Sequence, residues 1–288
     1  MTYSQVEAPF NWIDSHIHLY DTNIEGFPFP PEQWTEIQYP HLPQTFYQVS
    51  DGTGVSKAVV VECSPRRQDN DWTLSLIEND PNMLGFVGYL DLRDEDFEVE
   101  IRRLAEHPKF LGFRQRSSDD PSLDDPTIFS KLAVVEELGL VFEMNLKRYP
   151  ATELAKVAQR YPDLVMIINH LGHIRLKEAI ENEAAAKRYQ GLENYPNIYI
   201  KLSAFYAMSG QDSPPLDYKE YLPILNPILE TFGSDRVFFG SNWPMSRRKG
   251  VYAPMPQLIQ DFCKSRDDLD TEKVMRLNAE RAYLRRGK

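Results

Sequence analysis

The chain has 288 residues, of which 42% are apolar and 26% are charged, a balance that is ordinary for a globular protein with a large core. Its net charge of −11 argues against nucleic acid or an anionic membrane as a partner, although a small anion can bind where the local charge is positive. No stretch approaches the roughly 18 apolar residues of a membrane span, and the first residues, MTYSQVEAPF, lack the features of a signal peptide, so a cytoplasmic location is expected.

Short apolar runs that are rich in Val, Ile and Phe recur along the chain, bounded by Gly, Pro, Asp or Asn. They cover residues 11–19, 57–63, 84–90, 110–115, 141–146, 165–170, 198–203 and 236–240. Runs of this kind are typical of strands buried on both faces of a sheet. Between them, apolar residues spaced three and four apart predict helices. These helical patterns cover residues 97–107, 129–138, 154–161, 221–232 and 255–263.

Eight strands that alternate with helices predict an α/β fold, a (β/α)8 TIM barrel formed by residues 1–288 as a single domain. An open doubly wound sheet is the alternative, but such sheets usually have a Gly-rich turn after the first strand, and this strand ends in His-Ile-His. Two long loops, residues 21–42 and 210–217, are expected on the C-terminal face of the barrel, where loops shape substrate pockets.

The first strand ends with two histidines, His16 and His18, which lie two residues apart. Residues i and i+2 of a strand point to the same side, so both imidazoles are expected at the end of the barrel where catalytic groups gather. Together they could bind one divalent ion or polarise one carbonyl. Asp14 lies two residues before His16, so its side chain is expected on the same side of the strand, beneath the two imidazoles, where it could support them. The alternative is a pair of hydrogen-bonded structural histidines.

Polar residues also interrupt or follow later strands, and these are Glu143, His170, Lys201 and Asn242. Burying a carboxylate or an ammonium group without a partner costs several kcal/mol. Four such residues at the ends of different strands therefore predict one shared polar site. The alternative is a set of unrelated hydrogen bonds in the interior.

Four segments, WIDSHIHLYD, NHLGH, IYIKLSAFY and FFGSNWPM, resemble the lactonase branch of the amidohydrolase superfamily. This branch includes hydrolases of sugar lactones, of muconolactones and of 2-pyrone-4,6-dicarboxylate. The resemblance extends from Trp12 to the C-terminus, with the motifs in the expected order. It implies a barrel fold and an enzyme that opens a lactone by water attack on the ring carbonyl at the C-terminal face.

The resemblance also implies roles for individual residues. His16, His18 and His170 match histidines that bind metal in some relatives and polarise the carbonyl without metal in others. Glu143 falls where relatives often have an acidic residue, and it could complete a zinc or manganese site. The usual lysine ligand and a second late-strand histidine are not visible. One divalent metal ion, or none, is therefore expected rather than a two-metal centre.

Asn242 departs from the family pattern, because relatives usually read Gly-Ser-Asp-Trp-Pro where this chain reads GSNWP. In relatives that aspartate takes the proton of the attacking water. An amide has no proton affinity near neutral pH, so Asn242 cannot be a general base, although its position belongs to the catalytic set. Three explanations stay open: a substitution made to trap substrate, a base elsewhere, or a natural member with altered chemistry.

Basic residues follow the predicted strands repeatedly, and they predict an electropositive mouth that binds an anionic lactone. They are Arg66, Arg67, Arg93, Arg114, Arg116, Lys147, Arg148, Arg175, Arg247 and Arg248. The residues expected to bind substrate are Arg66, Arg114, His173, Lys201 and Trp243. The alternatives are loop arginines paired with Asp119, Asp120, Asp124 and Asp125, and His173 and Trp243 as simple packing. His41 has no supporting context and is expected on the surface or in a loop.

Two other functions stay open as alternatives to a lactonase. One is a metal-dependent decarboxylase of a muconate-type acid, and the other is a catalytically impaired barrel that binds a ligand, because Asn242 replaces the usual aspartate. In each case the partner is a small molecule rather than nucleic acid or membrane, and a homo-oligomer is left open.

Overall fold

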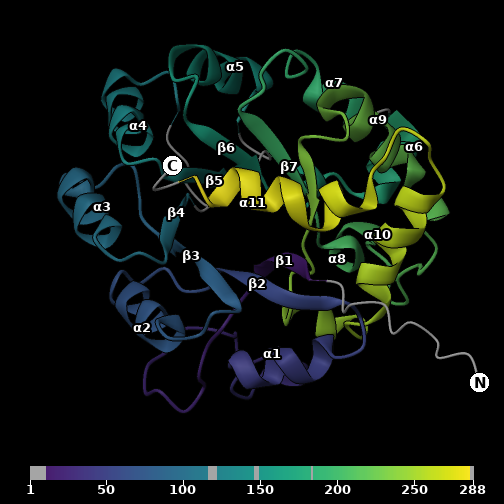
Figure 1. Ribbon diagram of the computed structural model, residues 1–288, viewed down its shortest axis with the longest axis horizontal. Helices are drawn as coiled ribbons and strands as arrows, with labels where there is room; N and C mark the ends of the chain where they lie inside the picture. The colour runs from purple at the N-terminus through teal and green to yellow at the C-terminus, as the bar shows by residue number, and fades with distance from the viewer. Residues whose placement is uncertain (1–10, 116–121, 146–148, 183, 286–288) are drawn as a thin grey trace, which may run out of the picture.

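The computed structural model describes residues 11–115, 122–145, 149–182 and 184–285. Expectations for the first ten residues and for Arg116, Asp119, Asp120, Lys147 and Arg148 lie outside these ranges. Eight parallel strands follow one another around a single sheet in the order β1 to β8 (Figure 1). The strands are β1 (Trp12–Ile17), β2 (Val55–Val61), β3 (Met83–Tyr89), β4 (Phe110–Arg114), β5 (Val141–Met144), β6 (Val165–Ile168), β7 (Ile198–Leu202) and β8 (Val237–Phe239).

The sheet closes on itself through the segment that follows β8. Ile17 forms a parallel bridge with Trp243, the His18 amide donates to the Trp243 carbonyl at 2.7 Å, and the Asn242 amide donates to the His16 carbonyl at 2.9 Å. The predicted (β/α)8 barrel is therefore confirmed. The open doubly wound sheet is wrong, because the strand order never reverses and the first strand joins the last.

Helices surround the strands as a ring (Figure 1). They are α1 (Pro43–Ser50), α2 (Gln68–Ile77), α3 (Phe97–Ala105), α4 (Pro126–Glu137), α5 (Ala151–Arg160), α6 (Leu176–Asn182), α7 (Ala184–Tyr189), α8 (Phe205–Ser209), α9 (Leu222–Phe232), α10 (Pro254–Lys264) and α11 (Asn278–Tyr283). The start of α4 shows how the sequence sets a boundary. Pro126 occupies the first turn, and the Asp125 carboxylate accepts the Thr127 amide at 2.8 Å.

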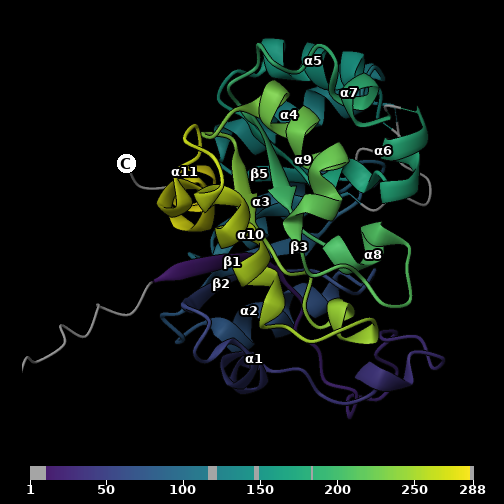
Figure 2. The ribbon, with the colours of Figure 1, turned by 90° about the vertical axis from the view of Figure 1, so that its right-hand side faces the viewer.

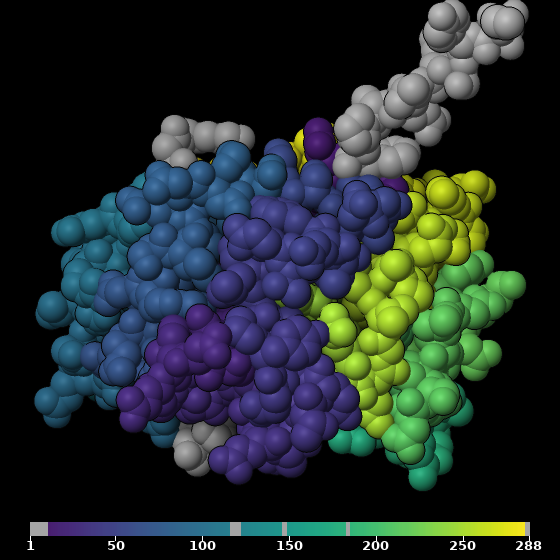
Figure 3. Space-filling view, turned by 90° about the horizontal axis from the view of Figure 1, so that it is seen from below, coloured from purple at the N-terminus to yellow at the C-terminus, as the bar shows by residue number. Residues whose placement is uncertain are grey.

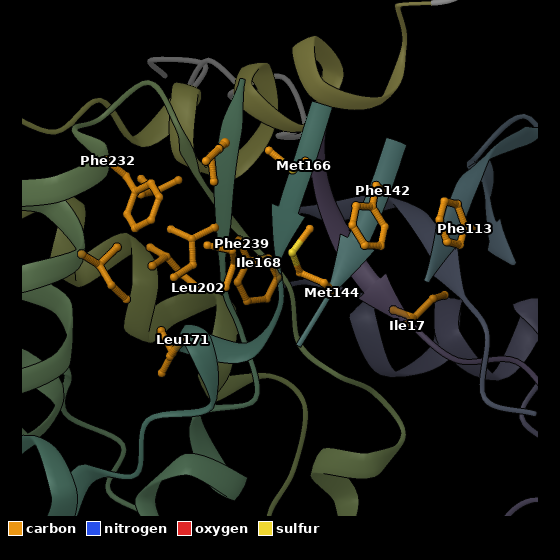
Figure 4. Close-up of a cluster of buried hydrophobic side chains, with 14 of the residues drawn as sticks. Ile17, Phe113, Phe142, Met144, Met166, Ile168, Leu171, Leu202, Phe232 and Phe239 are labelled. Carbon is orange, nitrogen blue, oxygen red and sulfur yellow. The ribbon is translucent and has the colours of Figure 1, made fainter. Parts of the chain in front are cut away.

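Side chains alternate between the inside of the barrel and the layer beneath the helices. An inner cluster includes Val59, Val87 and Ile167, whereas the larger outer cluster joins the strands to the surrounding helices. Figure 4 shows part of the outer cluster, in which the rings of Phe113 and Phe142 stack with their centroids 5.0 Å apart. Because both faces of each strand are covered, a polar side chain inside the barrel must find its partners there.

The two ends of the barrel differ. At one end α11 lies across the strands and adds Ala279, Ala282 and Tyr283 to the inner cluster (Figure 1). The loop of residues 21–42 and the short helix α8 lie at the opposite end (Figure 2). Since α8 directly follows β7, that end is the C-terminal face, as predicted for the loop.

The loop of residues 21–42 includes a 3-10 turn (Thr35–Ile37) and lies beside the segment that follows β8 (Figure 3). The Arg248 guanidinium lies over the Trp34 ring, and the central carbon of the guanidinium is 4.1 Å from the ring centroid. Within the described ranges, none of the helices combines the length and apolar character needed to cross a bilayer.

Candidate active site

Imidazole rings from two parts of the chain, the end of β1 and the segment after β6, meet at the C-terminal end of the barrel. The ring centroids of His16 and His18 lie 5.0 Å apart, those of His16 and His170 lie 4.4 Å apart, and those of His170 and His173 lie 5.2 Å apart. Gly240 permits this packing, because a Cβ atom there would lie 2.9 Å from the His16 Cβ. The structure thus brings together the histidines that the sequence placed at different strand ends.

Asp14 does not share the orientation of these histidines. In the pairing of β1 with β2, three residues of β1 advance against two of β2 between Asp14 and Ile17, which is a bulge. The extra residue reverses the alternation, so the expectation that Asp14 supports the imidazoles from below is wrong. Its carboxylate instead accepts the Ser241 amide at 2.8 Å and the Tyr252 hydroxyl at 3.0 Å. Asp14 therefore fastens β1 to the segment after β8.

Inside the barrel, Lys201 forms an ion pair with Glu143 beneath His16. The Lys201 Nζ lies 2.8 Å from both Glu143 carboxylate oxygens and 3.1 Å from the His16 Nδ1. The Tyr283 hydroxyl, from α11, also donates to Glu143. Lys201 and Glu143 are fully buried, and burial lowers the pKa of Lys201 to about 8 although the Glu143 carboxylate opposes that shift. These side chains form a hydrogen-bonded column from the barrel floor to His16.

The protonation of His16 follows from the two cations beside it. Burial, followed by the Lys201 charge, holds the pKa of His16 well below its usual range, so the ring is neutral. Lys201 donates to Nδ1, which places the single ring proton on Nε2. The Arg114 Nη1 lies 3.5 Å from that Nε2, a long contact that a protonated Nε2 cannot accept. Both hydrogens are therefore available to an oxygen atom placed between them.

Arg114 is held in place by Glu62, which the sequence analysis did not identify. The Arg114 Nε donates to the Glu62 carboxylate at 2.7 Å, and Nη2 donates to the Glu62 backbone carbonyl at 2.7 Å. This leaves Nη1 directed at His16. The signal was visible in the sequence, because Glu62 is a charged residue directly after the apolar run of β2.

His170 gains its orientation from Ser203, at the end of β7. The Ser203 hydroxyl oxygen accepts the His170 amide at 3.1 Å and lies 3.0 Å from the His170 Nδ1. Burial holds the pKa of His170 well below its usual range, so this ring is also neutral. With the hydroxyl donating to Nδ1, the ring proton resides on Nε2. His170 then supplies a further N–H donor next to His16.

His18 and Asn242 face each other on the other side of the site. The Val61 carbonyl, which can only accept, lies 2.8 Å from the His18 Nδ1, so that nitrogen carries the proton of a neutral ring. The His18 Nε2 then has a lone pair, and it lies 3.1 Å from the Asn242 side-chain amide. The Asn242 atom at this distance is Oδ1, so a neutral His18 can accept from the NH₂ group only once the amide has turned over. In contrast to Asn242, the His18 Nε2 can accept a proton.

Backbone strain concentrates at these strand ends. His170, Leu171, His173, Ala204 and Asn242 all have φ between 53° and 61°, in the left-handed region that non-glycine residues rarely adopt. Such residues cost free energy and persist where a surrounding structure enforces them, often at functional sites. Asparagine tolerates this region better than most residues.

The remaining expected substrate-binding residues have other partners. Arg66 pairs with Asp69 at 2.7 Å and donates to the Gly26 carbonyl, which links it to the loop of residues 21–42. Trp243 is fully buried, with its ring packed against His41 and Phe46. Lys201 belongs to the buried column described above. Of that set, Arg114 and His173 lie beside the histidine cluster.

Two of the other arginines pair with acids, although not with the aspartates that the alternative named. Arg67 pairs with Asp94 and Asp96, and Arg93 pairs with Asp91. Fewer basic residues therefore contribute unbalanced positive charge at the C-terminal mouth of the barrel than the sequence predicted.

His41 lies in the long loop, as one of the two expectations had it, but it is fully buried rather than on the surface. Its Nδ1 lies 2.7 Å from the Tyr39 carbonyl, and its ring stacks on Tyr39 and contacts Trp243. The long loop folds inward here, because its aromatic residues form their own packed layer. Burial lowers the pKa of His41 to about 4.

Replacing His41 with phenylalanine is expected to make the free energy of unfolding depend less on pH between about pH 4 and 6.5. The unfolded chain binds a proton at His41 near pH 6.5, whereas the folded chain resists it until about pH 4. The shift corresponds to about 3 kcal/mol of stability that is present above pH 6.5 and lost as the pH falls to 4. Urea unfolding of both proteins at pH 4, 5, 6 and 7 measures this, and parallel profiles would contradict it.

The sequence matches the amidohydrolase family over residues 13–285. The chain belongs to this family. It is thus an enzyme of a hydrolase family, built on the barrel described above. A curated relative of this amidohydrolase, the L-fucono-1,5-lactonase of Burkholderia ambifaria, is 28% identical over 243 residues, which cover 83% of this chain and 82% of the relative.

Solved structures share the fold of this amidohydrolase. An amidohydrolase from Burkholderia multivorans with bound zinc has a TM-score of 0.81 at 21% identity, covering 95% of this chain and 99% of that one. A probable 2-pyrone-4,6-dicarboxylic acid hydrolase from Acinetobacter baumannii has a TM-score of 0.72 at 20% identity, covering 94% and 98%.

The zinc in that neighbour makes the donor set of this amidohydrolase important. The expected ligands are His16, His18, Glu143 and His170. Among the described residues, no group of three or more His, Cys, Asp or Glu side chains is arranged to hold a metal ion. Glu143 is turned to Lys201, and His16 has the cations Lys201 and Arg114 at its two ring nitrogens. In this arrangement both ring nitrogens of His16 face cationic side chains, so they do not serve as metal ligands.

Proposed function

We propose that this amidohydrolase opens a small lactone by attack of water on the ring carbonyl at the C-terminal face of the barrel. The observation that carries the proposal is the pair of N–H donors, the Arg114 Nη1 and the His16 Nε2, that face each other at 3.5 Å. An oxygen that gains negative charge would accept from both, and such preorganised donors are usually the largest contribution to acyl-transfer catalysis. The lactonase relative supports this reaction class.

The neutral state of the histidines suits this role. A neutral imidazole donates a hydrogen bond without giving up its proton, and the low pKa values of His16 and His170 keep both rings in that state. Arg114 adds a permanent positive charge that needs no metal ion. His16, His170 and Arg114 therefore polarise the carbonyl and hold the oxyanion that forms.

The attacking water binds on the opposite side, next to the contacting pair of His18 and Asn242. Asn242 orients the water but cannot take its proton. A neutral His18 with its proton on Nδ1 accepts the proton of the water at Nε2 as the water attacks. The ring C–O bond then breaks, and the proton passes to the alkoxide that leaves, which yields the open hydroxy acid.

The substrate is a sugar-acid lactone that carries a further anionic group. Lactonases of fuconate and rhamnonate among the curated relatives support a sugar ring. Arg114 and the basic residues that line the cavity beside Asn242 support the anionic group.

A ring-opening assay with a pH indicator tests the function, using a panel of 1,4- and 1,5-lactones of sugar acids. Arg114→Met is expected to lower kcat by roughly 10²- to 10³-fold, the effect of removing one oxyanion donor, while a chelator leaves the rate unchanged. Arg67→Met, at a surface ion pair, is the matched control and is expected to keep full activity. Unchanged kcat in Arg114→Met would contradict the proposal. Release of CO₂ without ring opening would indicate a decarboxylase instead.

A further inference from the structure

A cavity of about 300 Å³ adjoins Asn242 on the C-terminal face. Its described lining includes three cationic side chains, Arg175, Arg248 and Lys249, and no carboxylate. Lys249 is paired with the exposed Asp212, so Arg175 and Arg248 supply the uncompensated charge of the wall. In a chain with a net charge of −11, such a wall favours an anionic ligand.

Two donors on this wall are buried without a hydrogen-bond partner among the described residues. They are the Ser246 hydroxyl, on a side chain that is only 5% exposed, and the Arg248 Nε. Buried polar groups in folded proteins are normally paired, and an unpaired one indicates a ligand or a bound water. Both donors belong to residues that line the same cavity. Both atoms are closed to solvent in this arrangement, so a ligand with two acceptor oxygens would satisfy them after a small shift of the two side chains.

Arg248 is also oriented in advance. Its guanidinium lies over the Trp34 ring at 4.1 Å, which fixes the plane of the group while its edge stays able to donate. Asn242 connects this cavity to the reacting centre, because it lines the cavity and also faces the His18 Nε2. A substrate whose carbonyl lies at Arg114 could therefore extend a substituent towards Arg248.

We propose that this cavity is a subsite for a carboxylate group carried by the lactone, held by Ser246, Arg248 and Arg175. The planar carboxylate matches the two parallel donors of a guanidinium. The proposal rests on the lactonase function proposed above. It narrows the substrate class to lactones of sugar dicarboxylic acids, in preference to lactones that end in a hydroxymethyl group.

Two lactones that differ only at this position test the subsite, glucaro-1,4-lactone with a terminal carboxylate and glucono-1,4-lactone with a terminal hydroxymethyl group. The enzyme is expected to prefer the acidic lactone. Arg248→Met is expected to raise KM for it by roughly 10- to 100-fold, the value of a charged hydrogen-bonded pair, and to change KM for the neutral lactone by less than about threefold. Ser246→Ala, which disturbs packing least, is expected to act in the same direction.

Arg247→Met is the matched control. Arg247 belongs to the same segment but lies over the Tyr39 ring and does not line the cavity. It is expected to leave both KM values unchanged. Equal effects of Arg248→Met and Ser246→Ala on the two lactones would overturn the subsite, although lactone hydrolysis itself would stand.

Calorimetric titration with glutarate, an unreactive dicarboxylate, separates the two proposals. Binding to the natural chain and to Arg247→Met, with loss of binding in Arg248→Met and Ser246→Ala, would support the subsite even if no lactone were opened. No glutarate binding to the natural chain, together with no preference for the acidic lactone, would overturn it.

Discussion

Replacing Asn242 with aspartate is expected to raise kcat for lactone hydrolysis by about 10²-fold, the lower end of what a positioned general base contributes. The carboxylate would face the His18 Nε2, where the amide now lies at 3.1 Å, and would take the proton of the attacking water. The gain is at the lower end because His18 already provides a proton acceptor. The strained backbone (φ 61°) does not oppose the change, since aspartate also tolerates the left-handed region. Steady-state kinetics of both proteins on the lactone panel measure the effect.

His18→Asn provides the matched test in both backgrounds. In the natural chain it is expected to lower kcat by about 10²- to 10⁴-fold, because His18 is then the only base, whereas in the Asn242→Asp variant the loss should be smaller. If the aspartate variant is no faster and His18→Asn has no effect, water attack at this position is wrong. A barrel that binds its ligand without turnover would then be the better description.

Replacing Lys201 with methionine is expected to lower the free energy of unfolding by about 3–5 kcal/mol, the usual cost of removing one partner of a buried ion pair. The carboxylate of Glu143 would stay fully buried with only the Tyr283 hydroxyl as a donor. Activity should also fall, because the His16 Nδ1 loses the donor that fixes its tautomer. Urea unfolding and the pH profile of kcat/KM are the two measurements.

A second substitution distinguishes charge imbalance from lost packing. Lys201→Met combined with Glu143→Gln should recover most of the lost stability, because no uncompensated charge stays in the barrel. It should not recover activity, since His16 still lacks its donor. A double variant that is as unstable as the single one would show that the ion pair is not the reason. Full activity in either variant would contradict the role of Lys201 in positioning His16.

The barrel could be predicted because its signal repeats. Each strand is an apolar run buried on both faces, so the eight runs could be counted from the sequence. Several helices lacked a clear period: α2 has a weak apolar face and mixes Asp69, Asn70 and Asp71 with its core residues. α11 is short and was not predicted, although it closes one end of the barrel.

The sequence predicted which residues form the candidate site, but only some of the contacts that these residues make. His16, His18 and His170 converge because parallel strands bring their C-terminal ends together. The bulge in β1 could not be predicted, because it depends on the pairing with β2 and not on local sequence, and it moved Asp14 away from the imidazoles. Glu143 was expected beside the histidines and instead binds Lys201, since a buried ammonium group needs a carboxylate.

The origins of the charged groups around His16 have a consequence for recombination of barrel halves. Beside His16, the residues of β1 to β4 supply the ion pair of Glu62 with Arg114, and the residues from β5 onward supply that of Glu143 with Lys201, together with Tyr283. Each half thus supplies an ion pair whose charges balance. The His16 ring lies between the two pairs, with Nε2 near Arg114 and Nδ1 near Lys201. A chimera that takes its second half from this enzyme keeps the Lys201–Glu143 pair satisfied, but its first half must still supply counterparts of His16, His18 and the Glu62–Arg114 pair.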